Sequence, residues 1–250
     1  GGMKLLALDT PDGKLRPEQI DREAWGWGDE HRAQPLVVSI TQSTELGTNY
    51  TPEEVRAIAN TAHAQGMHLH LDGSRIANAA ASLDVPLRAF TTDAGVDVLS
   101  LGGTKNGALG AEAIVVLHTE ASEGLRYLRK LNMQLGSKQR FASAQLIALF
   151  EGELWRESAA HANSMATRLR AALVDATATG RLTFTQETQS NAVFARLPFA
   201  AAETLRARFG FYDWAGPFAD GTVEVRWMCS WDTTTADVDA FAEAITAALA

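Results

Sequence analysis

Between residues 35 and 117, short apolar runs rich in β-branched residues alternate with segments that carry helix signals. The runs PLVVSI (35–40), MHLHLD (67–72), VDVLSL (96–101) and AIVVL (113–117) have the length of β-strands. Thr51 and Glu54 form a capping box for a helix that ends at Gly66, and further helical segments follow from about Arg75 and after Pro86. This alternation predicts an α/β fold built from βαβ units, whose ligands bind at the carboxyl ends of the strands.

The second half of the chain has a different pattern. Helix is expected from about Ala121 to Gly180, with one long amphipathic run from Phe141 to Leu173. Strands are expected at 182–186, 191–198 and 222–231, and helices at 203–208 and 235–249. We therefore predict a large domain (1–150), with a mostly parallel sheet and helices on both faces, and a small α+β C-terminal domain (151–250).

Composition narrows the class of protein. The chain has 22 Lys and Arg residues and 30 Asp and Glu residues, which give a formal net charge of −8. The sequence contains no basic stripe, so a nucleic-acid partner is not expected. No apolar run is long enough to span a bilayer and no signal peptide is visible, so no membrane partner is expected. The single cysteine, Cys229, cannot form an internal disulfide, which favours the cytoplasm.

Lys105 lies in the loop GGTKNG, directly after the strand-like run VDVLSL. A phosphate-binding loop is disfavoured because the GxxxxGK[ST] spacing is absent. A solvated loop lysine is the plain alternative, unless other functional groups converge on it. The third interpretation is a lysine that forms a Schiff base with a carbonyl cofactor, for which Gly102 and Gly103 would leave room.

Asp72 ends the preceding strand and shares one face of it with His68 and His70, because side chains alternate along a strand. An aspartate at this position can pair with the ring nitrogen of pyridoxal phosphate and keep that nitrogen protonated. One alternative is a helix N-cap. Another is a metal-dependent hydrolase that uses His68, His70 and Asp72, although core histidines are favoured over metal ligands here.

Five stretches together resemble the threonine aldolase and β-eliminating lyase family of pyridoxal-phosphate enzymes. They are TQSTELGT, HLHLDGSRIANA, GGTKNG, SKQRFASAQ and VRWMCSWDTTTADVDAF. The resemblance covers essentially the whole chain and implies pyridoxal-phosphate fold type I, the aspartate aminotransferase-like architecture. It also implies an aldolase that cleaves L-threonine, phenylserine or related β-hydroxy-α-amino acids to glycine and an aldehyde. A homodimer or homotetramer with a shared active site is implied as well. Another lyase or a transaminase of this fold is the alternative, because the motifs specify the cofactor more than the substrate.

The resemblance implies a role for each matching residue that faces the cofactor. Lys105 matches the lysine that holds pyridoxal phosphate covalently, and Asp72 matches the partner of the ring nitrogen. Thr104, in the lysine motif, belongs to the expected cofactor-binding residues. Arg140 resembles an arginine that helps to hold the phosphate group, often across a subunit interface.

Two further arginines are implied in substrate binding. Arg75, in the DGSR motif, resembles the arginine near the cofactor and the substrate carboxylate. Arg226 resembles the arginine that anchors the α-carboxylate, a task suited to a planar bidentate donor; an exposed strand arginine is the alternative. Some members of the family carry a histidine where Glu45 stands, so no general base is assigned.

The second departure from the family concerns the beginning of the chain. In the family, GGMKLL follows a segment that supplies the phosphate-cradling loop and the side chain that stacks on the pyridine ring. That segment is not found here, and Gly1-Gly2-Met3 fits either a start at Met3 or a chain cut from something longer. We therefore expect these 250 residues alone to bind pyridoxal phosphate weakly, to catalyse slowly and to expose apolar surface. A non-catalytic, incomplete chain is a further alternative.

Overall fold

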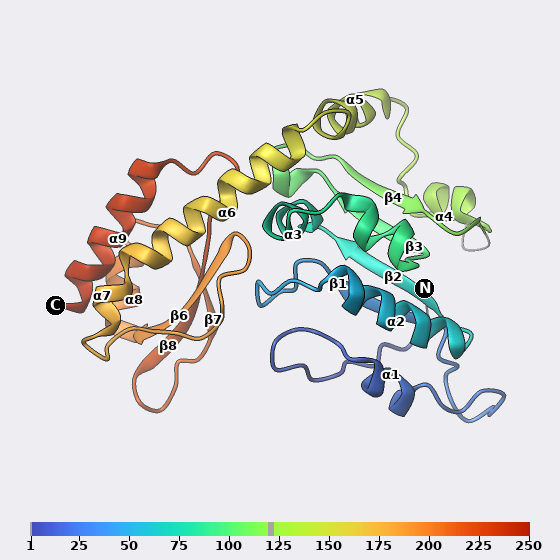
Figure 1. The fold of residues 1–250 in the computed structure, drawn as a ribbon, viewed down its shortest axis with the longest axis horizontal. Helices are drawn as coiled ribbons and strands as arrows, with labels where there is room; N and C mark the ends of the chain where they lie inside the picture. The colour runs from blue at the N-terminus through green and yellow to red at the C-terminus, as the bar shows by residue number, and fades with distance from the viewer. Residues whose placement is uncertain (1, 120–122) are drawn as a thin grey trace.

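The computed structural model describes residues 2–119 and 123–250 as two four-stranded sheets linked by one long helix (Figure 1). Gly1 and the expected helix start at Ala121 lie outside the described residues. The strands are β1 (Val37–Thr41), β2 (His68–Gly73), β3 (Val98–Gly102), β4 (Glu112–Val116), β5 (Thr183–Phe184), β6 (Ala192–Pro198), β7 (Tyr212–Ala215) and β8 (Thr222–Met228). The α-helices are α1 (Pro17–Glu23), α2 (Pro52–Ala64), α3 (Ile76–Leu83), α4 (Leu125–Leu131), α5 (Arg140–Phe150), α6 (Leu154–Ala172), α7 (Val174–Thr177), α8 (Phe199–Arg206) and α9 (Thr235–Leu249).

The first sheet has the order β1-β2-β3-β4. β1, β2 and β3 are parallel, which confirms the predicted βαβ units, and β4 is antiparallel to β3. β4 reverses direction because residues 103–111 are too few for a parallel crossover. Asp72 pairs with Thr41 of β1 and with Ser100 of β3, so the carboxyl ends of the three parallel strands lie level. The predicted site residues that follow these strands therefore share one edge of the sheet.

Helix α2 begins as its sequence predicts, and it ends at Ala64, just before the predicted Gly66. The Thr51 side chain accepts from the Glu54 backbone N–H and the Glu54 carboxylate accepts from that of Thr51, so the capping box is complete. Pro52 occupies the first turn. The apolar face that the sequence predicts, Val55, Ile58, Ala59 and Ala62, is buried in the core.

The helical region after residue 122 differs from the prediction. The expected single run is broken, because α5 ends at Phe150 and α6 begins at Leu154. Gly152 lies between them, and glycine is a poor helix former because of its backbone freedom.

Two elements were not predicted from the sequence. α1 begins at Pro17, and the Gln19 side chain accepts from the Arg16 backbone N–H at 2.9 Å, so a proline in the first turn was the available signal. β7 is a short edge strand with partly exposed side chains, which is too short for a period-two pattern to be recognised.

The second sheet has the order β5-β6-β8-β7 and is antiparallel throughout. α8 and α9 pack against each other, and α6 packs on α9. These elements enclose a core of their own, which contains Trp227, Ile245 and Leu197. No helix among the described residues is long and apolar enough to cross a membrane.

Helix α6 contributes to both cores. Trp155 and Ala159 belong to the core around the first sheet, whereas Ala166 and Leu169 belong to the core around the second. In Figure 1 this helix runs from one half of the molecule to the other. We propose that the two domains divide at residue 150, and that α6, in the second domain, also packs on the core of the first.

Asp97 joins the start of β3 to α2 and β2. Its carboxylate accepts from the Leu69 backbone N–H at 2.7 Å and lies 2.9 Å from His63 Nε2, although its side chain is only 5% exposed. Burial would raise the pKa of this carboxyl, but the contacts to Leu69 and His63 hold it below its usual value of 3.8. The carboxylate of Asp97 therefore links β3 to β2 and α2 in its ionised form.

We expect Asp97→Ala to lower the free energy of unfolding by about 3 kcal/mol, because it leaves the Leu69 N–H buried without an acceptor. A carboxyl whose folded pKa is lowered stabilises the protein above its unfolded pKa. The contribution of Asp97 is therefore lost as the pH falls below 3.8. Urea unfolding followed by circular dichroism measures both effects. Asp93→Asn is the control, since Asp93 makes an exposed ion pair with Arg88, and equal midpoints for the two variants would contradict the role of Asp97.

Candidate active site

Lys105 lies on a 3₁₀ turn (Thr104–Asn106) just beyond the end of β3. The turn is held in place on both sides of the lysine, since Asn106 Nδ2 donates to the Trp155 carbonyl at 2.8 Å and the Gly103 N–H donates to the Ala111 carbonyl at 3.0 Å. The side chain of Lys105 is exposed, and its amine has no hydrogen bond or ion pair within residues 2–119 and 123–250. A fixed backbone thus presents a free amine at the carboxyl edge of the sheet.

The two glycines before this turn are needed for close backbone packing. A Cβ atom on Gly102 would lie 2.8 Å from Ser74 Cα, and one on Gly103 would lie 2.6 Å from the Ala111 carbonyl oxygen. The sequence interpretation was that these glycines leave room for a cofactor. In the structure, Gly102 lets the end of β3 pack on the turn after β2, and Gly103 lets the lysine loop close on Ala111.

Asp72 occupies the end of β2, on the strand adjacent to the one that leads to Lys105. Its Oδ1 atom accepts from both the backbone N–H and the hydroxyl of Ser74. The residue at the N-cap of α3 is Arg75, so Asp72 does not cap that helix. Oδ2 of Asp72 receives no hydrogen bond from any residue that the structure describes, and this oxygen remains available to a ligand.

His70 lies on the same face of β2 as Asp72 and has both ring nitrogens engaged. Nδ1 is 2.8 Å from Ser39 Oγ on β1, and Nε2 is 3.0 Å from Ser100 Oγ on β3. Burial lowers the pKa of this histidine below 6.5, against the opposing effect of Asp72. His70, which is half-buried, therefore links β1, β2 and β3 through its two ring nitrogens.

The three residues of the metal-hydrolase alternative, His68, His70 and Asp72, each contact a different partner. His68 points to Asp97, with Nδ1 3.7 Å from Oδ1, whereas His70 bonds to serine hydroxyls and Asp72 bonds to Ser74. Within the described ranges, no group of three or more His, Cys, Asp or Glu side chains could hold a metal ion.

Arg75, at the N-cap of α3, and Arg226, on β8, meet at one carboxylate, that of Glu45. Arg75 Nη1 lies 3.5 Å from Glu45 Oε1, and Arg226 Nη1 donates to Glu45 Oε2 at 2.9 Å. The two arginine side chains are 12% and 17% exposed, so neither is an ordinary surface arginine. All three side chains line a small cleft between the two halves of the protein. The structure therefore brings the two predicted carboxylate-binding arginines together.

The surroundings of Arg226 leave hydrogen-bonding groups unused. Its guanidinium carbon lies 4.6 Å from the centroid of the Trp214 ring, which supports the side chain from β7. Arg226 Nε is buried and has no hydrogen-bond partner among the described residues. The same is true of Asn191 Oδ1, on another residue of the cleft. One buried donor and one buried acceptor beside the cleft thus have no partner among the described residues.

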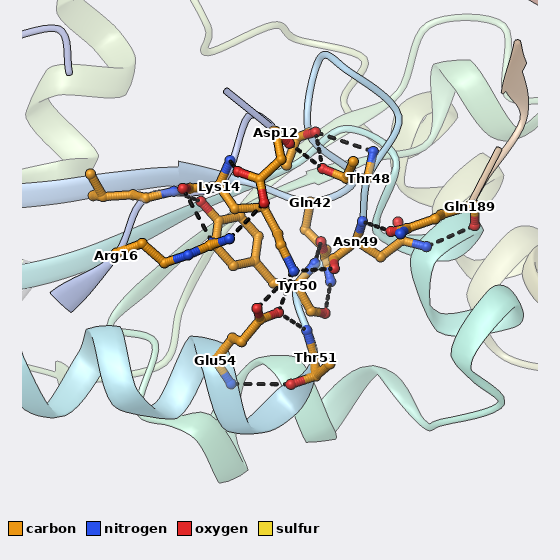
Figure 2. A network of polar contacts seen from close by, with 12 residues as sticks. Asp12, Lys14, Arg16, Gln42, Thr48, Asn49, Tyr50, Thr51, Glu54 and Gln189 are labelled. Atoms are coloured by element: carbon orange, nitrogen blue, oxygen red, sulfur yellow. Dashed lines mark hydrogen bonds and ion pairs between the residues drawn. The ribbon is translucent and has the colours of Figure 1, made fainter. Parts of the chain in front are cut away.

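The loop that carries Glu45 is anchored at its base, as Figure 2 shows. Gln42 Nε2 donates to the Tyr50 carbonyl at 2.8 Å, and the Tyr50 N–H donates to Gln42 Oε1 at 3.0 Å. Asn49 makes two 2.8 Å hydrogen bonds to Gln189, in the chain that leads to β6. Gly47, at the tip, has a φ of +77°, which favours glycine. The backbone around Glu45 is therefore fixed, and it is tied to the second half of the protein.

The remaining predicted site residues lie apart from this cleft. Arg140 is exposed at the first turn of α5, and its guanidinium stacks 4.9 Å from the Phe141 ring centroid. Thr104 is exposed, and its backbone N–H donates to Glu112. In the part of the chain that the structure describes, neither Arg140 nor Thr104 contacts Arg75 or Arg226. The roles of Arg140 and Thr104 in cofactor binding therefore stay predictions. Trp214 was missed by sequence analysis, because β7 has no strand signal of its own.

The architecture is that of the pyridoxal-phosphate fold type I enzymes, as the resemblance implied. The structure of threonine aldolase from Leishmania major matches with a TM-score of 0.89 and 31% sequence identity, and the match covers 100% of this chain and 71% of that one. The family model for beta-eliminating lyases matches residues 1–198. The chain belongs to the beta-eliminating lyase family.

Two curated relatives extend the comparison. The low specificity L-threonine aldolase of Pseudomonas aeruginosa is 42% identical over 233 residues, which are 93% of this chain and 65% of that protein. The low specificity L-threonine aldolase of Pseudomonas sp. is 40% identical over 249 residues, which are 99% of this chain and 70% of that protein. This chain therefore spans about two thirds of the length of these relatives.

Proposed function

We propose that the protein is a pyridoxal-phosphate-dependent aldolase, which cleaves L-threonine and related β-hydroxy-α-amino acids to glycine and an aldehyde. The observation that carries this proposal is the meeting of two largely buried arginines, one from each half, at the edge of the sheet that also bears Asp72 and Lys105. Family membership and about 40% identity to two low specificity L-threonine aldolases support it.

The side chains at the sheet edge suit pyridoxal phosphate. The free amine of Lys105 would hold the cofactor covalently, and the open Oδ2 of Asp72 would accept a hydrogen bond from its ring nitrogen. Bound pyridoxal phosphate supplies an electron sink for the bonds at the substrate Cα atom. Ser74 holds the Asp72 carboxylate in one orientation through two hydrogen bonds, so its free oxygen faces a constant direction.

The arginine pair would bind and orient the amino-acid substrate. Two guanidinium groups that hold one α-carboxylate restrict rotation about Cα, and this orientation decides which bond at Cα breaks. An aldolase must align the Cα–Cβ bond, whereas a transaminase must align the Cα–H bond. The arginine pair could bind the substrate for either reaction. The sequence identity to threonine aldolases therefore favours cleavage of the Cα–Cβ bond.

A product assay tests this proposal. The purified protein is titrated with pyridoxal phosphate, monitored by visible absorbance, and then supplied with L-threonine or phenylserine. Glycine together with acetaldehyde or benzaldehyde is the expected product pair. A keto acid as the product would show a transaminase instead, and cofactor binding without any product would reject the catalytic proposal for this chain.

Arg226→Ala is expected to weaken binding of an amino-acid substrate about 10- to 100-fold, because charge-assisted hydrogen bonds to the α-carboxylate are lost. Covalent binding of pyridoxal phosphate to the protein should remain. Titration with glycine, followed by absorbance, measures the affinity. Arg196→Ala is a matched control, since Arg196 also lies on a strand, pairs with Asp220 and stacks on Phe218, but away from the cleft. Equal affinities in the two variants would contradict the role of Arg226.

We also propose a homodimer or homotetramer that works in the cytoplasm. Large apolar side chains are exposed on and around α4 and α5, and Leu131, Met133 and Phe141 are among them. Burial of such surface against a second copy is favourable. Light scattering coupled to size-exclusion chromatography measures the subunit count, and a monomer at micromolar concentration would contradict the assembly.

A further inference from the structure

The Glu45 carboxylate contacts both Arg75 and Arg226. Under the proposed function, the substrate carboxylate binds to these same two arginines. Each of the two carboxylate oxygen atoms of Glu45 faces a different guanidinium group, at 3.5 Å from Arg75 Nη1 and at 2.9 Å from Arg226 Nη1. A single carboxylate between two arginines is the arrangement that an α-carboxylate would require in the same place. The protein thus supplies an internal anion for its own anion site.

The electrostatics of the cleft favour an anion there. Burial lowers the pKa of Arg75, the charge of Arg226 lowers it further, and Glu45 opposes both effects. Two adjacent guanidinium groups that are mostly buried repel each other, and one carboxylate reduces this repulsion. Removal of Glu45 would therefore leave a strongly attractive site for another anion, provided that the arginines stay in place.

The side chain of Glu45 can leave this site without unfolding of the loop. It is 56% exposed, whereas its two arginine partners are largely buried. The backbone on both sides is held by the Thr44 N–H, which donates to the Thr48 carbonyl at 2.9 Å, and by the Gln42 and Asn49 contacts described above. Rotation about the side-chain bonds of Glu45 is therefore enough to expose the arginines, and its carboxylate then returns to water.

We propose that Glu45 is a resident carboxylate of the Arg75 and Arg226 site, and that an amino acid binds by exchanging its own carboxylate for that of Glu45. This inference rests on the proposed function for the identity of the incoming ligand. The exchange lowers the net affinity for carboxylates, since every ligand must displace an internal competitor. It also keeps the two arginines paired while the site is empty, and it makes Glu45 a residue that determines the affinity for carboxylates.

Binding of acetate to the protein without cofactor tests the exchange. The indole N–H signal of Trp214, next to Arg226, reports occupancy in ¹H–¹⁵N spectra and is identified with Trp214→Phe. Sodium acetate replaces chloride at constant ionic strength. Glu45→Gln should lower the Kd of acetate about tenfold, because a charged competitor becomes neutral at nearly constant shape. Glu45→Asp keeps the charge and should bind acetate about as weakly as the native protein.

Two further variants sharpen this experiment. Glu243→Gln removes one negative charge from an exposed position on α9 and should leave the Kd of acetate unchanged, which excludes an effect of net charge. Glu45→Gln combined with Arg226→Ala should lose the gain. Equal acetate affinities in the native protein and in Glu45→Gln would overturn the exchange, and so would weaker binding in Glu45→Gln, because Glu45 would then only organise the arginines.

The outcome is separable from that of the proposed function. Tighter acetate binding by Glu45→Gln in a protein that does not cleave threonine would support the exchange and reject the aldolase. Cleavage of threonine by the native protein, with equal acetate affinities in the native protein and in Glu45→Gln, would support the aldolase and overturn the exchange.

Discussion

Replacement of Lys105 by alanine is expected to abolish covalent binding of pyridoxal phosphate and to lower threonine cleavage by a factor of about 10³ or more. Lys105 has a free amine on a turn that Asn106 and Gly103 hold at the carboxyl edge of the sheet. No other side chain in this turn can form a covalent bond with an aldehyde. Borohydride reduction of the protein with pyridoxal phosphate, followed by peptide mass mapping, measures the attachment directly.

Lys138→Ala provides the control for this experiment. Lys138 is an exposed lysine before α5, so its loss changes the charge of the protein by the same amount without touching the sheet edge. Cofactor attachment and product formation should be unchanged in this variant. A pyridoxyl label on Lys4, Lys14, Lys130 or Lys138 of the native protein, instead of Lys105, would contradict the assignment.

Asp72→Asn is expected to lower turnover by a factor of about 10² to 10⁴, while the affinity for pyridoxal phosphate changes less. A carboxylate next to the ring nitrogen stabilises its protonated form, and a neutral amide cannot do so. The loss should therefore appear in kcat for threonine cleavage and only weakly in the cofactor titration. Steady-state kinetics at saturating cofactor measure the first quantity, and an absorbance titration measures the second.

Ser74→Ala separates the charge of Asp72 from its structural contacts. This variant removes the Ser74 hydroxyl that donates to Asp72 Oδ1 but keeps both the backbone N–H contact and the carboxylate. Turnover should fall much less than in Asp72→Asn. If both variants retain near-normal turnover, Asp72 is only part of the turn after β2, and another group must act on the ring nitrogen.

Much of the first half of the protein could be predicted from local sequence. The capping box of Thr51 and Glu54, the buried face of α2 and the parallel strands β1, β2 and β3 all agree with the prediction. Each of these features depends on residues within a few positions of each other or on a simple period. Gly152, which separates α5 from α6, was a local signal that the amphipathic pattern around it concealed.

The candidate site was predicted in part. Asp72 ends one strand and Lys105 follows the next, so the rule for parallel sheets was enough to place them at one edge. Arg75 and Arg226 were recognised only through resemblance to a family, because an arginine has no periodic signal of its own. Glu45 was noted as a substitution for a histidine, and nothing in its local sequence indicated an ion pair with either arginine.

Local sequence was enough to predict the strands other than β7 and most of the helices, since capping, side-chain alternation and glycine turns act over a few residues. Tertiary structure alone decided which charges meet. Glu45 and Arg226 are 181 positions apart in the sequence. They meet because helix α6 and the hydrogen bonds between Asn49 and Gln189 hold the second sheet against the carboxyl edge of the first. Electrostatic attraction depends on distance in space and on burial, and neither can be read from spacing along a chain.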